Sequence, residues 1–570
     1  MFQPNLRRYL RQANCNIKRN NMEEFKLIID AIGSFLWNNY TLYAVVATGI
    51  IFTIWSGFSQ YYALTHGFKV IKGDYDKDDD PGAISHFQAL STALSATVGL
   101  GNIGGVALAI SLGGPGAVFW MWVVGFLGMA IKLSEVSLSM IHRNTDDPEN
   151  PSGGPMWVVE RNFSGKKGLM KYLGKLIAGI FCFALIINTI TAGNMFQAWN
   201  VANLTEAYFG VPTLATGMIL ALIVGSVIIG GIKRIGAVTS KLVPIMLMIY
   251  ILACIYVLTL NFTAIPEMLK LIVSAAFSPM ESSNAFLGGT AGAAFIFGMQ
   301  RALFSNEAGQ GSSAIAHSAA KTDEPVREGV VAGLEPFIDT IVVCTMSALV
   351  ILVTGIWNRP AEVQLSDLTV NQSGQNWSID GTITNAPSLN DGNKVFMIYS
   401  GKENTEAGNS LHKVYGKVAV SGSGKSIDWD VISSKTPPEI NGAVYLDYVG
   451  ANLTAAAFDK VSSGLGKWLV TLASWLFAIS TMISWSYYGE KGVSFLFGEK
   501  AILTYKLAFC ALAVLSTTGF IQTDRELNLF ANLGTGLCIM ANLPILWLFG
   551  YQAIRDYKLY ISKLKAGDFD

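Results

Sequence analysis

Charged residues are scarce in this sequence. Asp, Glu, Lys and Arg make up only 14% of the 570 residues, against about 25% in typical soluble domains, so we do not expect a soluble enzyme. The 40 basic and 40 acidic residues cancel, which leaves no net positive field to attract nucleic acid. The six cysteines include no CxxC pair and the five histidines form no HExxH motif, so the sequence predicts neither a metal centre nor a hydrolase.

Long stretches without charge are what the sequence does contain. A run of about 20 apolar residues is long enough to cross a bilayer as a helix. We therefore predict an all-α polytopic membrane protein with eight transmembrane helices within 34–357 and three within 456–556. The eleven candidate spans lie near residues 34–58, 83–110, 115–141, 175–200, 207–231, 242–262, 288–317, 336–357, 466–488, 503–521 and 528–551.

Basic residues are unevenly distributed between the connections. On one side of the membrane, the short connections between spans carry only two basic residues, Lys270 and Arg525. Because Lys and Arg favour the cytoplasmic side, we predict a cytoplasmic tail at 557–570 and, with an odd number of spans, an external N-terminus. The connections on the other, cytoplasmic side carry twenty basic residues. These connections are 59–82, 142–175, 232–241, 318–335, 489–503 and the tail from 552.

The N-terminal tail, residues 1–33, conflicts with this orientation because its basic residues would have to cross the membrane. We hypothesise that translation begins at Met22, after which Lys26 faces three acidic residues. Native protein whose N-terminal sequence starts at Met1 would contradict the hypothesis. The basic residues of the tail are Arg7, Arg8, Arg11, Lys18, Arg19 and Lys26.

Residues 358–455 differ from the rest in being rich in Asn, Ser, Gly and Asp. Short alternating stretches at 377–384, 394–399, 414–420 and 444–448 are separated by turn residues, which is typical of strands. We predict a small β-rich domain on the external or periplasmic face. It serves either as a passive lid or as a module that binds an unknown partner.

The span at 83–110 is interrupted by Gly99, Gly101, Gly104 and Gly105. Each glycine destabilises a helix by about 1 kcal/mol relative to alanine, so we predict that the span unwinds in its middle. Irregular backbone at membrane depth lines a cavity, where carbonyls can bind a cation and N–H groups a carboxylate. Close helix packing is the alternative. The spacing Gly99-x-Gly101-x-x-Gly104 matches a dinucleotide-binding fingerprint, but no strand precedes it, which argues against nucleotide binding. The string Thr97–Gly101 resembles a potassium-channel filter, but it occurs only once, which argues against a filter of that kind.

Polar residues also interrupt other spans. In 288–317 we predict a break near 305–309 and interpret Arg301 and Glu307 as structural partners, paired with each other or with other helices. Ser480 and Thr481 supply either two oxygen ligands for Na+ or hydrogen bonds to their own helix. Asp339 is a candidate proton or cation partner. Lys132 and Glu135, three residues apart, are predicted to form a salt bridge.

Several longer motifs occur in one order along the chain, and together they resemble the alanine or glycine:cation symporter family over about residues 22–555, apart from 358–455. They are Thr97-Val98-Gly99-x-Gly101-Asn102-Ile103, Gly113-Gly114-Pro115-Gly116-Ala117-x-Phe119-Trp120-Met121-Trp122, Phe304-Ser305-Asn306-Glu307-Ala308-Gly309, Phe337-Ile338-Asp339-Thr340 and Trp485-Ser486-Tyr487-Tyr488-Gly489-Glu490.

The resemblance implies a bacterial inner-membrane transporter with the five-plus-five inverted repeat of the sodium-coupled leucine and neurotransmitter transporters. Its first and sixth core helices are broken, and here those would be 83–110 and 288–317, with core helices 1–7 starting from about residue 83. It also implies that Val98, Ser480 and Thr481 bind Na+. The substrate-binding residues that it implies are Thr97, Gly99, Gly101, Asn102, Gln197, Phe304, Ser305 and Trp485.

The implied function is uptake of alanine or glycine, coupled to Na+, by alternating access, with no cofactor and no catalytic residue. The partners are then the small neutral amino acid, Na+ and the lipid bilayer. H+ coupling through Asp339 or Glu307, an ion channel, and a transceptor whose insert senses a ligand are the alternatives. Alanine, glycine, D-alanine and serine are not distinguished by the sequence.

Overall fold

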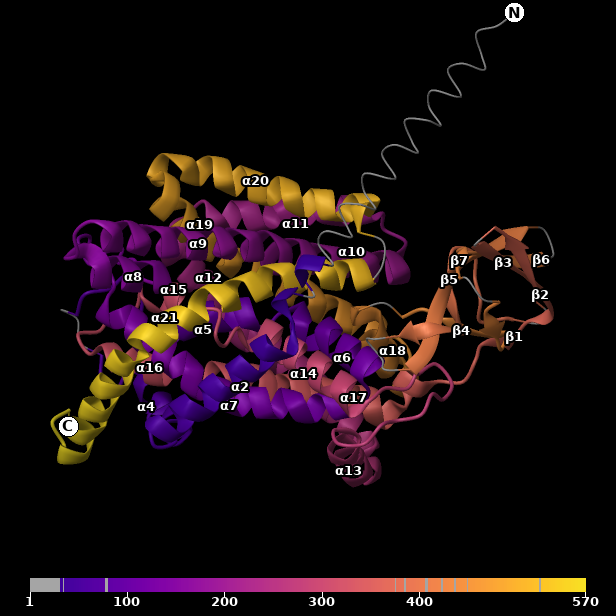
Figure 1. Cartoon of the computed structure of the whole chain (residues 1–570), viewed down its shortest axis with the longest axis horizontal. Coiled ribbons are helices and arrows are strands. Elements are labelled where there is room, and N and C mark those ends of the chain that lie inside the picture. The colour runs from indigo at the N-terminus through magenta and orange to yellow at the C-terminus, as the bar shows by residue number, and fades with distance from the viewer. Residues whose placement is uncertain are drawn as a thin grey trace, which may run out of the picture.

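The structure, a computed structural model, describes residues 31–569 except for the positions given at the end of this paragraph. In the described part, a large bundle of helices carries a smaller group of strands at one end (Figure 1). The Met22 hypothesis and residues 1–30 of the tail lie outside the described residues. The undescribed positions are 1–30, 34, 77–79, 375, 384–385, 405–408, 422–423, 435–436, 449, 522–523 and 570.

The bundle is built from helices on both sides of the strand-containing segment. Those before it are α2 (Asn39–Trp55), α3 (Gln60–Thr65), α4 (Gly67–Ile71), α5 (His86–Thr97), α6 (Val106–Gly113), α7 (Gly116–Ile141), α8 (Pro155–Ser164), α9 (Leu169–Ile190), α10 (Phe196–Phe209), α11 (Thr213–Ile228), α12 (Gly231–Leu260), α13 (Ile265–Ala275), α14 (Ala291–Asn306), α15 (Ala314–His317), α16 (Pro325–Ala332) and α17 (Thr345–Thr354). Those after it are α18 (Ala451–Val461), α19 (Thr471–Phe497), α20 (Ile502–Leu515) and α21 (Asp524–Ala566).

Five π-helical turns interrupt or extend these helices in the described part of the chain. A π-turn inserts one extra residue per turn and is frequent at functional sites. They are η1 (Gly101–Gly105), η2 (Thr191–Met195), η4 (Phe337–Cys344), η6 (Gly466–Val470) and η8 (Ser516–Phe520).

The described helices form seven to nine apolar spans. Two of the nine are bent pairs, α2 with α3 and α4 at 76°, and α5 with η1 and α6 at 48°. The other two predicted spans, α11 and α14, contain 16 residues each, and a helix of that length is about 24 Å long, less than the roughly 30 Å of a bilayer core. The count of eleven therefore stays a prediction. The seven long spans are Gly116–Ile141, Leu169–Phe209, Gly231–Leu260, Pro325–Thr354, Gly466–Phe497, Glu499–Phe520 and Glu526–Ala566.

The outer helices expose apolar side chains, while the largely apolar interior also contains many polar and charged side chains. Leu222, Ile229 and Leu507 on outer helices are more than half exposed, whereas Asn102 and Lys132 are fully buried. Apolar side chains on the outside match a lipid environment, and polar ones inside must be hydrogen-bonded to one another. The protein is thus a multi-pass membrane protein whose interior holds its polar chemistry.

Local sequence determines where the two key helices begin. A capping box starts α5, in which Gln88 N donates to Ser85 Oγ (3.2 Å) and Ser85 N donates to Gln88 Oε1 (3.1 Å). The N-cap of α14 is Thr290, whose hydroxyl accepts from Ala293 N (3.1 Å). Both helices then run into the middle of the bundle.

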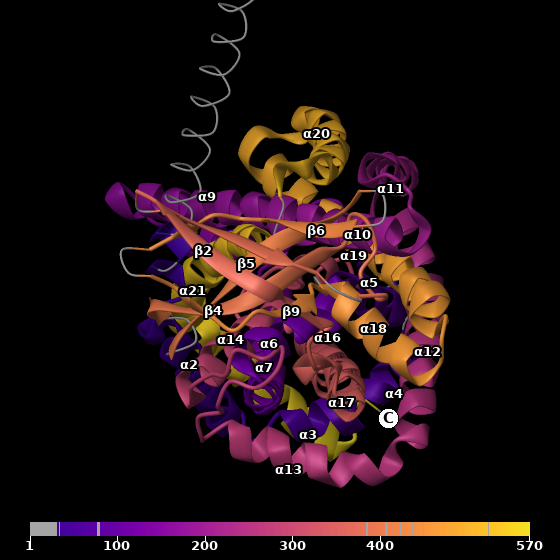
Figure 2. The same ribbon diagram turned by 90° about the vertical axis from the view of Figure 1, so that its right-hand side faces the viewer.

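The strands all lie between Val363 and Leu446, within the segment that the sequence predicts to be β-rich. One sheet has the order β1-β9-β4-β5-β6 with β8 paired to β4, and the other has the order β2-β3-β7. Figure 2 shows strands of the first sheet crossing the end of the bundle. Trp377, Val395 and Val414 belong to a core separate from that of the helices. The strands are β1 (Val363–Gln364), β2 (Ser366–Ser373), β3 (Asn376–Thr382), β4 (Lys394–Asn404), β5 (Asn409–Ser421), β6 (Gly424–Trp429), β7 (Ile432–Ser433), β8 (Glu439–Ile440) and β9 (Ala443–Leu446).

Candidate functional site

The first helix break lies between α5 and η1, inside the glycine-rich segment. Val98 has extended backbone (φ −79°, ψ 91°) and ends α5. Gly99 N donates to Asn102 Oδ1 (2.8 Å), and Leu100 N donates to Gln197 Oε1 (3.0 Å). Two of the N–H groups that the break frees are therefore held by the side chains of Asn102 and Gln197, both predicted to bind substrate.

Oxygen atoms of α5 and α19 converge beside this break. Thr481 Oγ1 donates to Ser95 O (3.0 Å) and lies 3.5 Å from Val98 O. Ser480 Oγ donates to Phe477 O (2.9 Å) of its own helix, while its carbonyl accepts from Ser95 Oγ (2.7 Å). The structure thus brings together Val98 and Thr481 from the predicted Na+ set and adds carbonyls of residues that the set did not contain.

The second break ends α14 within the predicted interval 305–309. Glu307 adopts left-handed backbone (φ 57°, ψ 15°), which few residues other than glycine do. Asn306 Oδ1 accepts from Ala308 N (3.0 Å), and Gln310 Nε2 donates to Leu303 O (2.6 Å). The Asn306 side chain thus replaces the acceptor that Ala308 N would have in a continuous helix, and Gln310 adds a second donor to Leu303 O, which also accepts from Glu307 N (3.2 Å).

Asp339 of η4 connects the two breaks. Its Oδ1 accepts from Asn102 Nδ2 (2.6 Å) in the first break and from Ser305 Oγ (3.1 Å) next to the second. Its Oδ2 accepts from Thr340 Oγ1 (2.7 Å). Asn102 Nδ2 also lies 3.2 Å from Ser305 Oγ. Two predicted substrate residues are therefore joined through a fully buried carboxylate.

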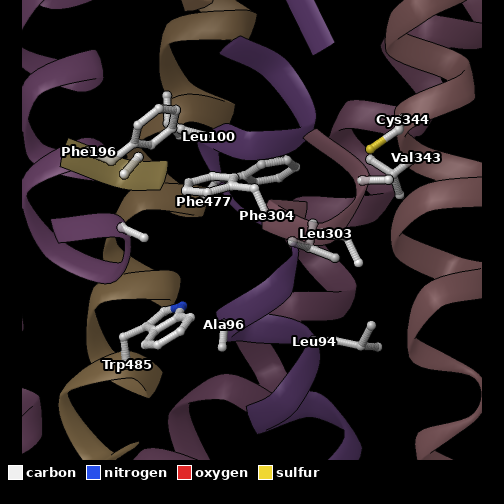
Figure 3. Close-up of a cluster of buried hydrophobic side chains, with 14 of the residues drawn as sticks. Leu94, Ala96, Leu100, Phe196, Leu303, Phe304, Val343, Cys344, Phe477 and Trp485 are labelled. Carbon is white, nitrogen blue, oxygen red and sulfur yellow. The ribbon is translucent and has the colours of Figure 1, made fainter. Parts of the chain in front are cut away.

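The two predicted aromatic residues do not meet. The ring of Phe304 lies 4.7 Å from that of Phe196, and Trp485 lies against Tyr488 with 5.3 Å between ring centroids. In Figure 3 Phe304 occupies the middle of a buried cluster, while Trp485 lies apart from it on another level, near Ala96. The two rings thus lie at different levels of the bundle (Figure 3).

Gly101 and Thr97, two further predicted residues, have different neighbours. A Cβ placed on Gly101 would come within 3.2 Å of the Phe304 ring, so that ring covers the backbone of the break. The Thr97 hydroxyl lies 3.3 Å from Ala93 O and from Leu94 O of its own helix.

The charged pair near the second break has structural partners. Arg301 donates to Asn528 and Asn532 of α21, the latter at 2.5 Å. Glu307 accepts a hydrogen bond from Ser312. These contacts tie the broken helix to its surroundings, as the structural interpretation expects.

The predicted salt bridge between Lys132 and Glu135 is wrong. Lys132 Nζ lies 3.1 Å from Glu335 Oε2 and 2.5 Å from Ser313 Oγ. Glu135 Oε1 accepts from Gly311 N (3.2 Å) and from Asn542 Nδ2 (2.6 Å). Because both side chains are buried, each takes a partner from another element, and their spacing along α7 does not decide the pairing.

Two interrupted helices, joined by buried polar groups inside an apolar bundle, are typical of secondary transporters. The chain belongs to the sodium:alanine symporter family, whose family model matches residues 22–384 and 436–570. It is therefore a symporter and not an enzyme. The unmatched residues 385–435 fall among the strands.

The chain is similar to known proteins over most of its length and of theirs. It is 36% identical to the sodium/alanine symporter AgcS of Methanococcus maripaludis over 87% of this chain and 89% of that protein. It is 28% identical to the putative sodium/proton-dependent alanine carrier protein YrbD of Bacillus subtilis, over 95% and 93%. Among solved structures, MhsT in complex with L-phenylalanine matches with a TM-score of 0.47 and 15% identity, over 84% of this chain and 99% of that one.

Proposed function

We propose that this protein couples the uptake of a small neutral amino acid, alanine or glycine, to Na+ by alternating access. The observation that carries this proposal is the convergence of the Thr481 hydroxyl on the carbonyls of Ser95 and Val98, at 3.0 Å and 3.5 Å. Family membership and the name of the 36% identical sodium/alanine symporter support the same ion and substrate.

Na+ is proposed to bind between α5 and α19. Hard cations prefer several oxygen ligands, and here carbonyls of Ser95, Val98 and Phe477 would act together with the hydroxyls of Ser480 and Thr481. The ion would replace the hydrogen bonds that these hydroxyls now make to carbonyls. Bound Na+ would then stabilise the arrangement in which the first broken helix packs against α19.

The amino acid is proposed to bind at the two breaks. Its carboxylate would take the N–H groups near Gly99 and Gly101, with Thr97 beside them, after the side chains of Asn102 and Gln197 exchange partners. Ser305 would contact the substrate from the second break. Larger side chains would be excluded by Phe304, whose ring covers Gly101, on one level and by Trp485 of α19 on the other (Figure 3).

Coupling follows from a shared conformational preference. If Na+ and the amino acid both favour the same arrangement of the first broken helix, each raises the affinity for the other by the same factor. We also propose that the helices form a five-plus-five inverted repeat. In this arrangement the segment 358–455 would lie on the external side and the C-terminus in the cytoplasm.

The test is Thr481→Ala in proteoliposomes. We expect the Na+ concentration for half-maximal alanine uptake to rise about tenfold or more, because one oxygen ligand worth about 1.4 kcal/mol is lost. Thr471→Ala is the matched control, since Thr471 starts the same helix and its hydroxyl has no hydrogen-bond partner within the described residues. Wild-type alanine uptake that is independent of Na+ would reject the proposed ion.

H+ is the second candidate for the coupling ion. Asp339 favours it, because a buried carboxylate that contacts both breaks is placed to link its protonation to their geometry. Uptake driven by a pH gradient without Na+ would support this alternative.

A further inference from the structure

A chain of buried charged side chains lies at the end of the bundle opposite the strands, where Figure 1 shows α16 and the C-terminus. It begins with His86 on α5 and continues through Glu328 on α16, His317 on α15 and Glu335 to Lys132 on α7. Each of the five residues is at most 1% exposed. None of them belongs to the proposed Na+ or amino-acid sites.

Successive members of the chain are in direct contact. His86 Nδ1 contacts Glu328 Oε2. His317 Nδ1 lies 2.5 Å from Glu328 Oε1, and His317 Nε2 lies 2.6 Å from Glu335 Oε1. Glu335 Oε2 then contacts Lys132 Nζ at 3.1 Å. His317 therefore joins two clamps, one that holds α5 and one that holds α7.

The contacts of His317 require a second proton. A neutral imidazole has one N–H and one acceptor nitrogen, yet both ring nitrogens of His317 face carboxylate oxygens at hydrogen-bond distance. The extra proton lies on the ring or on one of the two carboxyl groups. Without it, two buried carboxylates repel the lone pair of the imidazole and lack one compensating positive charge, which is strongly unfavourable in a low-dielectric interior.

This chain comes closest to an exposed side chain at His86, which is itself buried. His86 Nε2 has no hydrogen-bond partner within the described residues and lies 3.8 Å from Oδ1 of Asp76, whose side chain is 47% exposed. A proton can enter at this nitrogen and pass along the alternating imidazoles and carboxylates. The other charged or titratable groups that face the chain from neighbouring elements are Glu135, Arg143, Glu307, Asp339 and Tyr488.

The half-helix α5 is the element that such a proton would control. Its far end is the break at Val98, and its N-terminal end is held to the α15–α16 hairpin by the His86–Glu328 contact and by Lys321 N donating to Ile84 O (2.8 Å). If the charged contact weakens, α5 can pivot about the break, where its own helical hydrogen bonds already end.

We propose that His317, between Glu328 and Glu335, is a proton-binding site that latches this end of the transporter in its closed arrangement. With the proton bound, the two clamps hold α5 and α7 to the hairpin, and loss of the proton releases α5. The inference rests on the proposed alternating-access function, since that function requires this end to open. On the predicted topology this end faces the cytoplasm, so cytoplasmic pH would set the frequency of opening.

The test measures amide hydrogen exchange of residues 86–97 in lipid nanodiscs without Na+ or substrate. After correction for intrinsic chemical exchange, we expect opening at about pH 8.5 to exceed that at about pH 6 by about threefold or more. His317→Gln should show fast exchange that is equal at the two pH values, because glutamine does not titrate. His86→Gln, the second variant, should show the same, because α5 has then lost its contact with Glu328 whether or not His317 carries the proton. His66→Gln is the matched control. His66 is another buried histidine, 2.7 Å from Tyr560 Oη, and it does not belong to the chain of charged side chains from His86 to Lys132.

Equal protection of α5 at both pH values in the wild type would overturn the proposal. So would a pH response that persists in folded His317→Gln and His86→Gln protein, or one that is lost in His66→Gln. Because the measurement contains neither Na+ nor amino acid, it is independent of the transport assay. A wild-type protein that lacks Na+-stimulated uptake but shows the pH response would reject the proposed function and keep the proton site.

Discussion

Gly99 has no space for a side chain in the first break. A Cβ at this position would come within 2.4 Å of Thr481 Oγ1 and 3.2 Å of Gln197 Oε1. We expect Gly99→Ala to displace the Thr481 hydroxyl from the carbonyls of the break. The Na+ concentration for half-maximal uptake should rise about tenfold, equivalent to about 1.4 kcal/mol, as measured in proteoliposomes at saturating alanine.

The control for this substitution is Gly165→Ala. Gly165 follows α8, has φ −80°, and an added Cβ there has nothing within 4 Å. It should leave both the Na+ dependence and the maximal rate unchanged. An unaltered Na+ dependence in Gly99→Ala would show that Thr481 is not a ligand.

Individual site residues could be predicted only where the side chain itself is unusual. Glycines in a span and a hydroxyl at Thr481 are visible in the sequence, so the first break and the proposed Na+ ligand beside it could both be predicted. Ser95 could not be predicted because its proposed role belongs to a backbone carbonyl, which every residue has. His86 and His317 were missed because no local pattern pairs them, and only the folded chain brings them both to Glu328.

At the scale of elements, Asp339 holds two broken helices to η4. Removing its carboxylate in Asp339→Ala would leave the hydroxyls of Ser305 and Thr340 buried without their acceptor, at a cost of about 1–3 kcal/mol for each donor. Asn102 Nδ2 would keep its longer contacts of 3.2 Å with the Asp339 carbonyl and Ser305 Oγ. We expect loss of most uptake and a lower melting temperature. Asp339→Asn retains one acceptor oxygen and should keep at least about half of the activity.

The comparison of the two substitutions separates a clamp from a proton carrier. Asparagine cannot bind and release a proton, so a protein that uses Asp339 as the H+ carrier would be inactive in both variants. Melting temperatures measured on the same preparations show whether a loss of uptake reflects unfolding. An inactive but normally stable Asp339→Asn protein would transfer the coupling role from Na+ to H+.

The positions of the breaks could be predicted, but their internal form could not. Glycine content and the polar interval 305–309 predict where α5 and α14 end, since both features destabilise a membrane helix. The π-turn η1 depends on hydrogen bonds shifted by one residue, which leave no trace in helix propensity. The same holds for the partners of Lys132, because burial made contacts between elements outweigh those along α7.

At the scale of the whole molecule, the strand region, residues 363–446, has a hydrophobic core of its own. A separate cluster, which includes Leu287 and Phe396, packs the strands against the connection that precedes α14. The composition of 358–455 predicted strands because it alternates and is rich in turn residues. It could not predict the two sheets or their order, because strand pairing is non-local.

The two ends of the strand region are adjacent, so most of it can be deleted without separating the flanking segments. Strands β1 and β9 are antiparallel neighbours, with Val363 opposite Val444 and Gln364 opposite Ala443. Replacing residues 365–442 by Asn-Gly would join them through a two-residue turn of the kind that suits a hairpin. We expect Na+-stimulated alanine uptake within about threefold of the wild type, because the proposed sites lie entirely within the helical bundle and a threefold change is only about 0.65 kcal/mol.

The deletion also distinguishes the roles considered for the strands. A passive lid predicts faster or unchanged uptake, whereas a transceptor predicts that uptake survives and a ligand response disappears. A well-folded deletion protein, shown by size-exclusion chromatography and an unchanged melting temperature, that had lost uptake would instead make the strands part of the transport cycle. The proposed Na+ and amino-acid sites would then be incomplete, since no residue of 365–442 contributes to them.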